Sequence, residues 1–199
     1  MPKIVHRSAI LDIDRLANLI RDIDENDRGS FCSSEALKLI PRIFLCPGEV
    51  RMLRWEYVNF KEKRILLPAD FMKMDREFIV PLSSQVLKQL EALKMSTGYS
   101  ELLFPNSKDS SKPMSKNVLT NRLRDLGYEA NIMSAHGCRS SASTTLVEQL
   151  DWDPEVVDVQ LSHLTGTATS RAYNRAIHLN KRTKMMQEWS DFLEKLKHL

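Results

Sequence analysis

A single block of strand-like sequence, residues 55–82, lies between long stretches in which apolar residues recur with helical spacing, and this arrangement most constrains the fold. Residues 55–60 and 64–68 flank a turn-like Lys-Glu-Lys sequence, as in a β-hairpin. Residues 77–82, with the sequence EFIVPL, favour a third strand. The pattern therefore predicts an α+β fold, a mostly helical domain that contains a small antiparallel three-stranded β-sheet.

The apolar spacing predicts helices at residues 13–23, 36–44, 50–55, 84–93, 115–126, 135–150 and 154–161. Pro41 predicts a bend or an interruption in the second of these helices. Residues that favour helix ends recur at the expected places, namely Ser84, Ser115, Ser134, Asp153 with Pro154, and Gly127. We find no internal repeat and no linker, and residues 1–199 are therefore expected to form one domain.

The end of the chain, residues 183–199, is expected to form a last helix with an apolar stripe. The stripe consists of Trp189, Phe192, Leu193, Leu196 and Leu199. It favours packing against the domain's own core, and the alternative is docking onto a neighbouring subunit.

The composition, with 42% hydrophobic and 28% charged residues, is that of an ordinary globular domain and excludes a disordered tail. Apolar runs stay well short of the roughly 18 residues of a membrane span, and no apolar signal core follows the N-terminus. We therefore expect a cytoplasmic protein that does not bind membranes. The cysteines, Cys32, Cys46 and Cys138, form no Cys-x-x-Cys pair, which argues against a disulfide framework and a zinc knuckle.

Charge is distributed unevenly, although the net charge is only +3. Residues 148–158 are acidic and contain no base, whereas residues 171–184 are basic and contain no acid. The basic residues of the second stretch are Arg171, Arg175, Lys181, Arg182 and Lys184. This stretch is suited to a polyanion, and the simpler alternative is a solvated helix face.

The sequence SAHGCRSS, residues 134–141, places His136 and Arg139 three apart near the start of a predicted helix. Unpaired amide N–H groups and the positive end of the helix dipole favour an anion there. An imidazole and a guanidinium added at this point make a phosphate site, and the alternative is an exposed helix start.

Downstream, His163 follows a predicted helix and Tyr173 lies within the basic stretch. Histidine, tyrosine and arginines together suggest phosphate chemistry in which a phenol attacks. Because the reference pKa of tyrosine is about 10, the phenol needs a nearby base or cations that favour the phenolate. The alternative for Tyr173 taken alone is an aromatic residue packed on a helix.

Six blocks occur in order along the chain: CPGEVRMLRW, MKMDREFIVPL, LLFP, AHGCR, QLSH and RAYNRA. Together they resemble the catalytic domain of the tyrosine recombinases, most of all the integrases of prophages and genomic islands. The resemblance covers nearly the whole chain, and it implies a fold of the DNA breaking-rejoining enzyme type.

The resemblance implies a role for each matching residue. Tyr173 corresponds to the nucleophile that forms a 3′-phosphotyrosyl link to DNA, and His136 with Arg139 to the His-x-x-Arg pair. His163 corresponds to the second histidine and Lys73 to the lysine of the β-hairpin. The basic residues Arg171, Arg175, Lys181 and Arg182 are the expected DNA contacts. No metal and no cofactor are implied.

One position departs from the family: Cys46 stands where the first catalytic arginine is expected, three residues before the acidic Glu49. A thiol cannot donate the charged fork of a guanidinium to a phosphoryl oxygen. Loss of one such donor costs on the order of 10²–10³ in rate. Arg42, one helical turn earlier, is a candidate substitute for the missing charge.

The resemblance also implies assembly. We expect a partner in double-stranded DNA attachment sites, a tetramer on DNA, a monomer for the isolated domain, and exchange of the 183–199 helix between subunits. N-terminal DNA-binding modules of the family are expected to be absent from this chain. Three alternatives stay open: an inactive DNA-binding remnant, a type IB topoisomerase, and a cysteine hydrolase that uses Cys46 and His136.

Overall fold

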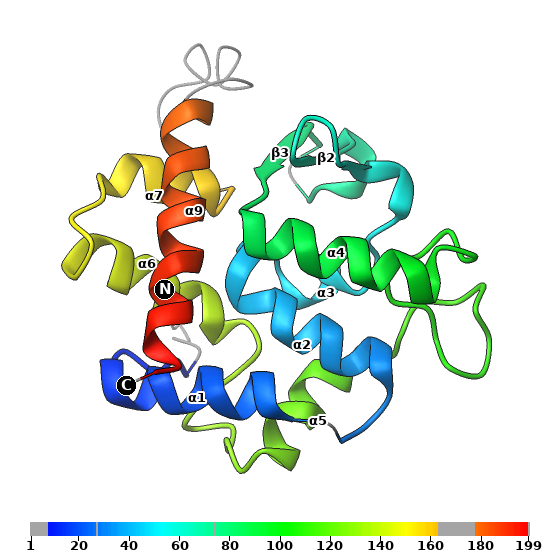
Figure 1. Ribbon diagram of the computed structural model, residues 1–199, viewed down its shortest axis with the longest axis horizontal. Coiled ribbons are helices and arrows are strands. Elements are labelled where there is room, and N and C mark those ends of the chain that lie inside the picture. The colour runs from blue at the N-terminus through cyan, green and yellow to red at the C-terminus, as the bar shows by residue number, and fades with distance from the viewer. Residues whose placement is uncertain (1–7, 27, 74, 163–177, 199) are drawn as a thin grey trace, which may run out of the picture.

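The computed structural model describes residues 8–26, 28–73, 75–162 and 178–198 (Figure 1). Its helices are α1 Ile13–Glu25, α2 Phe31–Ile43, α3 Pro47–Val50, α4 Ser84–Thr97, α5 Val118–Asp125, α6 Gly137–Glu148, α7 Pro154–Gln160 and α9 Leu179–Leu196. Its strands are β1 Val58–Asn59, β2 Arg64–Leu67 and β3 Phe78–Pro81, with short 3₁₀ turns at Trp55–Tyr57 and Ala69–Phe71. The predicted α+β class is confirmed.

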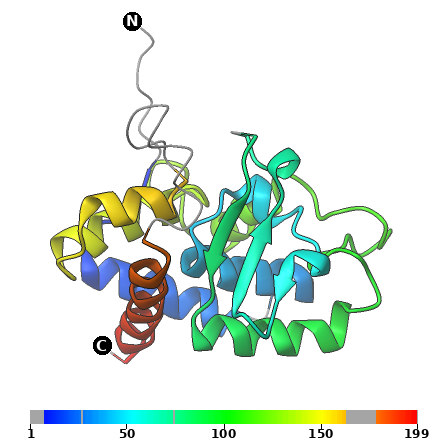
Figure 2. The ribbon, with the colours of Figure 1, turned by 90° about the horizontal axis from the view of Figure 1, so that it is seen from above.

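The described strands form one antiparallel sheet in the order β1-β2-β3. Ile65 pairs with Val80 and Leu67 with Phe78, and these side chains are buried because alternate residues of a strand face the core. The first strand is shorter than predicted, since the backbone N–H of Trp55 bonds to the carbonyl of Glu101 at 2.9 Å instead of joining the hairpin. Figure 2 shows the sheet on one side of the molecule and α6, α7 and α9 on the other.

Helix α2 lies at the centre of the domain and contacts α1, α3, α4, α5, α6 and α9. It begins five residues before the predicted start, because Ser30 accepts a hydrogen bond from the N–H of Ser33 at 3.3 Å and caps it. The helix also continues through Pro41 instead of breaking there. It ends at Ile43, and the next residue, Phe44, adopts the left-handed conformation with φ 59°.

Helix ends agree in part with the sequence signals. Asp153 caps α7 by accepting the N–H of Glu155 at 2.9 Å, and Gly127 follows α5 with φ +86°, as predicted. Ser83 rather than Ser84 caps α4, since its hydroxyl accepts the N–H of Val86. Helix α5 begins at residue 118. The helix predicted at residues 50–55 does not form as predicted, because α3 ends at residue 50.

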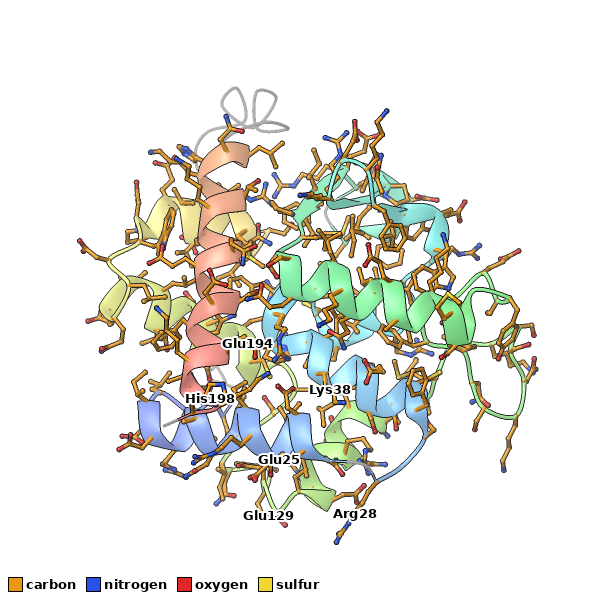
Figure 3. All side chains as sticks on the ribbon, viewed as in Figure 1. Glu25, Arg28, Lys38, Glu129, Glu194 and His198 are labelled. Carbon is orange, nitrogen blue, oxygen red and sulfur yellow. The ribbon has the colours of Figure 1, made fainter. Side chains whose placement is uncertain are left out.

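Helix α9 packs on the domain's own core, as the apolar stripe favoured. Trp189, Leu193 and Leu196 are at most 1% exposed, and the indole N–H of Trp189 donates to the carbonyl of Pro41 at 2.8 Å. Near the end of α9, Glu194 lines a pocket together with Lys38 of α2, and both are labelled in Figure 3. Throughout the described ranges, the helices lack the combination of length and apolar character needed to cross a membrane.

Candidate active site

His136 and Arg139 line one pocket of about 280 Å³ at the start of α6. Ser140, Ser143, Thr144 and Leu161 line the rest of it. Helix α6 supplies all of these residues except His136, which is its N-cap residue, and Leu161, which follows α7. The three-residue spacing therefore puts the imidazole and the guanidinium at one cavity, as the sequence predicted.

Arg139 is held in place by two backbone carbonyls from distant parts of the chain. Its guanidinium donates to the carbonyl of Phe44, at the end of α2, and to the carbonyl of Leu161 at 2.5 Å, at the end of α7. The side chain is 9% exposed. Because a guanidinium has five N–H donors, two such bonds fix its orientation and leave donors for an anion in the pocket.

The start of α6 is fixed by the N-terminal segment that passes over it. Ser134 accepts the N–H of Gly137 at 2.9 Å on its hydroxyl and donates that hydroxyl to the carbonyl of Ser8. A Cβ on Gly137 would stand 2.2 Å from the carbonyl oxygen of Ser8. A glycine therefore lets the backbone of residues 8–9 lie against the helix start beside His136.

Cys46 is the N-cap residue of α3 and lies two residues after Phe44, whose carbonyl holds Arg139. Its backbone N–H donates to the Glu49 carboxylate at 2.7 Å. The side chain is partly exposed. The short path from Phe44 to Cys46 brings the predicted position of the family arginine close to the carbonyl that orients Arg139.

Lys73 is exposed in the connection between β2 and β3. Three residues later, the Arg76 guanidinium donates to the carbonyl of Ser162 at 3.4 Å. This contact ties the Lys73 connection to the end of α7, next to the residues that line the pocket. Lys73 itself is not among the lining residues of that pocket.

His163, Tyr173, Arg171 and Arg175 lie outside the described residues. The chain enters that segment after Ser162 and leaves it at His178, directly before α9. Lys181 is exposed in the first turn of α9, where a cation can face a polyanion.

Arg182 contradicts the prediction that it contacts DNA. It is 2% exposed, and its guanidinium donates to the Gln160 side chain at 2.8 Å and to the carbonyl of Ile79. It also lies over the Phe78 ring at 5.0 Å. Burial, together with the nearby Arg76, lowers the pKa of Arg182 to about 10. Apolar spacing places residue 182 on the inner face of α9, so its charge points into the domain.

Arg42 does not act as the substitute for the missing arginine. It is 4% exposed and makes ion pairs with Asp24 at 3.0 Å and Glu194 at 3.5 Å. Two carboxylates compensate its buried charge and hold it toward α1 and α9. The guanidinium is therefore committed to the domain's packing.

Cys138 lies on the buried face of α6, and burial raises the pKa of its thiol to about 12. A metal-ligating cysteine must be a thiolate, which this environment disfavours. In the described ranges, histidine, cysteine and carboxylate side chains do not gather in groups of three suited to a metal ion.

Sequence reasoning missed Phe44 and Leu161, whose carbonyls hold Arg139, and Arg76, whose side chain reaches the carbonyl of Ser162. Phe44 and Leu161 contribute backbone carbonyls, for which side-chain chemistry offers no signal. Arg76 lies in the quoted block around Lys73, and its charge next to a strand was a usable signal.

Residues 11–179 match the sequence profile of the phage integrase family. The chain belongs to this family. This membership agrees with the resemblance of the six sequence blocks to the tyrosine recombinase family and its prophage integrases.

Several curated relatives are bacterial or phage proteins. The putative protein IntB of Escherichia coli (strain K12) is 33% identical over 203 residues, covering 95% of this chain and 51% of IntB. Prophage integrase IntS of the same strain is 35% identical, covering 83% of this chain and 43% of IntS. The integrase of Enterobacteria phage P4 is 35% identical, covering 84% and 41%. The chain spans about half the length, or less, of these relatives.

Solved structures of family members share the fold. The integrase from mycobacterium phage Brujita matches with a TM-score of 0.69 at 15% identity, over 98% of this chain and 65% of that one. XerA recombinase matches with a TM-score of 0.61 at 18% identity, over 92% and 66%. The Tn1549 transposon integrase, solved in complex with transposon right end DNA, gives 0.55 at 11% identity, over 90% and 69%.

Proposed function

We propose that this chain is the catalytic domain of a site-specific DNA recombinase that cleaves and rejoins strands through a 3′-phosphotyrosyl intermediate. The observation that carries the proposal is the shared pocket of His136 and Arg139, with Arg139 fixed by the carbonyls of Phe44 and Leu161. Those carbonyls lie two residues before Cys46 and two residues before His163. A scissile phosphate contacted by Arg139 would thus lie near both positions that the family pattern assigns to it.

In the proposed reaction the phenol oxygen of Tyr173 attacks phosphorus and forms a new phosphorus–oxygen bond. The bond between phosphorus and the 5′ oxygen breaks. His136 takes the phenolic proton, and Lys73 protonates the departing 5′ oxygen. Arg139 and His163 donate hydrogen bonds to the non-bridging oxygens, on which charge develops. Rejoining reverses these steps, because the phosphotyrosyl bond conserves the energy of the broken linkage.

The proposed partners are double-stranded DNA attachment sites, bound as a tetramer, with Arg171, Arg175 and Lys181 among the phosphate contacts. We further propose that the helix at residues 183–199 is exchanged between subunits in that assembly, although its Trp189, Leu193 and Leu196 pack on the chain's own core here. Phosphate contacts make binding strongly dependent on salt.

Cys46 favours a second candidate function, a DNA-binding remnant that does not cleave. The thiol lacks the charged donors of the family arginine, and loss of one transition-state donor costs about 3–4 kcal/mol. The Glu49 carboxylate accepts the backbone N–H of Cys46, a contact that does not depend on the side chain at residue 46. The two functions therefore differ in rate rather than in fold.

A nicked suicide duplex separates the two functions, because the short 5′-hydroxyl fragment leaves and traps the covalent complex. Duplexes tiled across the DNA that flanks the gene serve as substrates, and the complex is measured on a denaturing gel. We expect a covalent complex that Tyr173→Phe abolishes. A complex that persists in Tyr173→Phe, or none under any condition, would contradict the recombinase.

The variant Cys46→Arg tests the cost of the thiol in the same assay. We expect the rate of covalent-complex formation to rise by at least about 10²-fold, with DNA affinity much less changed, because the added charge acts mainly in the transition state. Rates within a few-fold of each other would show that another group already fills this role.

A further inference from the structure

Arg182 joins three segments of the fold by side-chain contacts, although its burial removes it from the DNA surface. Its Nε donates to the Gln160 side chain at 2.8 Å, which links the start of α9 to the end of α7. Its Nη2 donates to the carbonyl of Ile79 in β3. Figure 1 shows α9 beside α7, and α9 also contacts β3.

In the sequence, the residues joined by these contacts lie just before and just after His163 and Tyr173, which the proposed reaction uses. Gln160 lies three residues before His163, and Arg182 lies nine residues after Tyr173. The hydrogen bond between the side chains of residues 160 and 182 therefore holds together the end of α7 and the start of α9, which flank residues 163–177.

The same guanidinium also holds β3, the strand that follows the connection carrying Lys73. Phe78 lies under the Arg182 guanidinium at 5.0 Å, and Ile79 accepts from it, only five and six residues after Lys73. Arg76 adds a second tie, from this connection to the carbonyl of Ser162. Two arginines thus cross-link β3, the end of α7 and the start of α9.

We propose that Arg182 is a positioning residue. It holds the strand after the Lys73 connection against the end of α7 and the start of α9, which flank the segment carrying His163 and Tyr173. The inference rests on the proposed function, because those residues matter together only if one phosphate is contacted by all of them. Arg182 itself touches no DNA in this proposal. Its planar fork suits the task, since one guanidinium reaches a side-chain oxygen and a backbone carbonyl in different segments.

A matched pair of variants tests the proposal, because the chain contains a second buried arginine that anchors the same helix. Arg42 binds Glu194 near the other end of α9 and contacts neither α7 nor β3 through the bonds described above. Arg182→Met and Arg42→Met each remove one buried guanidinium and keep most of the apolar stem. Both are studied at a temperature at which circular dichroism shows them folded.

Amide hydrogen exchange is the first readout and does not depend on activity. In Arg182→Met we expect exchange in residues 78–81 and 154–162 to accelerate at least about tenfold, because local opening there loses its cross-link. In Arg42→Met the same amides should stay within about threefold of the unmodified chain. Equal acceleration in both variants would overturn the proposal and make Arg182 a general anchor of α9.

DNA binding and cleavage form the second readout. We expect the single-turnover rate on a saturating nicked duplex to fall on the order of 10²-fold in Arg182→Met, as misplacement by about 1 Å can cause. The dissociation constant should change less than about threefold, and its salt dependence should not change. A salt slope reduced by about one would show that Arg182 binds a phosphate, which overturns the proposal.

Gln160→Leu completes the test as a double-mutant cycle. Because Gln160 and Arg182 share one hydrogen bond, the effects of Gln160→Leu and Arg182→Met on exchange in β3 and α7 should be less than additive. Full additivity would contradict a shared link. If no variant cleaves, including Cys46→Arg, the proposed function fails, while hydrogen exchange still decides whether Arg182 holds the three segments together.

Discussion

Replacement of Trp189 by alanine is expected to show how far the domain depends on the docking of α9. Trp189 is 1% exposed, donates its indole N–H to the carbonyl of Pro41 at 2.8 Å, and meets Phe44 edge-on with ring centroids 5.8 Å apart. Phe44 in turn provides the carbonyl that holds Arg139. Trp189 therefore supports both the core and the residue next to the candidate site.

The expected magnitude follows from these contacts. Truncation of a buried aromatic side chain to alanine costs about 3–5 kcal/mol, and the lost hydrogen bond leaves a buried carbonyl unpaired at a further cost of about 1 kcal/mol. For a chain of this size, each kcal/mol lowers the melting temperature by roughly 2–4 °C. We therefore expect Trp189→Ala to lose about 4–6 kcal/mol and to melt at least about 8 °C lower.

Urea unfolding followed by circular dichroism measures the loss. Trp189→Phe is the matched control, since it keeps a ring against Phe44 but removes the N–H, and it should lose only about 1–3 kcal/mol. Met95→Ala, at an 89% exposed position, should be nearly neutral. The unfolding midpoint should not depend on protein concentration, because the helix packs on its own chain.

Two results would refute the reasoning. A loss below about 1 kcal/mol in Trp189→Ala would mean that α9 adds little to the core. A midpoint that rises with protein concentration would mean that Trp189 packs against a second copy of the chain.

Three further predictions concern single positions. Gly137→Ala places a Cβ 2.2 Å from the Ser8 carbonyl and should lower stability by about 1–3 kcal/mol in thermal melts; an unchanged melting temperature would show that residues 8–9 move aside freely. Cys138, whose pKa is raised to about 12 by burial, should resist iodoacetamide at pH 8 in the folded protein, and peptide mass spectrometry should find it alkylated only after unfolding. Hydrogen bonds from Lys112 and Ser111 lower the pKa of Asp109 to about 2. Their contribution to the stability of the folded protein is therefore complete above the ordinary pKa of 3.8 and disappears as the pH falls through about 2. Lys112→Ala should raise the NMR titration midpoint of the Asp109 carboxyl.

Much of the architecture could be predicted from local sequence. The Asp153–Pro154 start of α7, Gly127 after α5 and the alternation of β2 and β3 each depend on a few neighbouring residues. The joint placement of His136 and Arg139 is likewise a consequence of helical periodicity. Signals of this kind are encoded within one or two turns, so they survive without knowledge of the rest of the fold.

Helix α2 shows where local signals fail. Pro41 predicted a bend or an interruption, but the helix continues without interruption to Ile43, because packing against surrounding helices outweighs one lost backbone bond. Trp55 predicted a strand, but its N–H bonds to a residue far along the chain. In both cases the deciding partners are distant in sequence.

The sequence by itself determined the family blocks, the helical and strand periodicities and the spacing of the His-x-x-Arg pair. Only the tertiary structure decided which groups the arginine side chains bind. Arg139 is oriented by carbonyls 95 and 22 residues away, Arg42 is held by carboxylates, and Arg182 is turned into the core. A guanidinium can bind a phosphate, a carboxylate or a carbonyl with similar geometry, and which of them it meets depends on how distant segments pack.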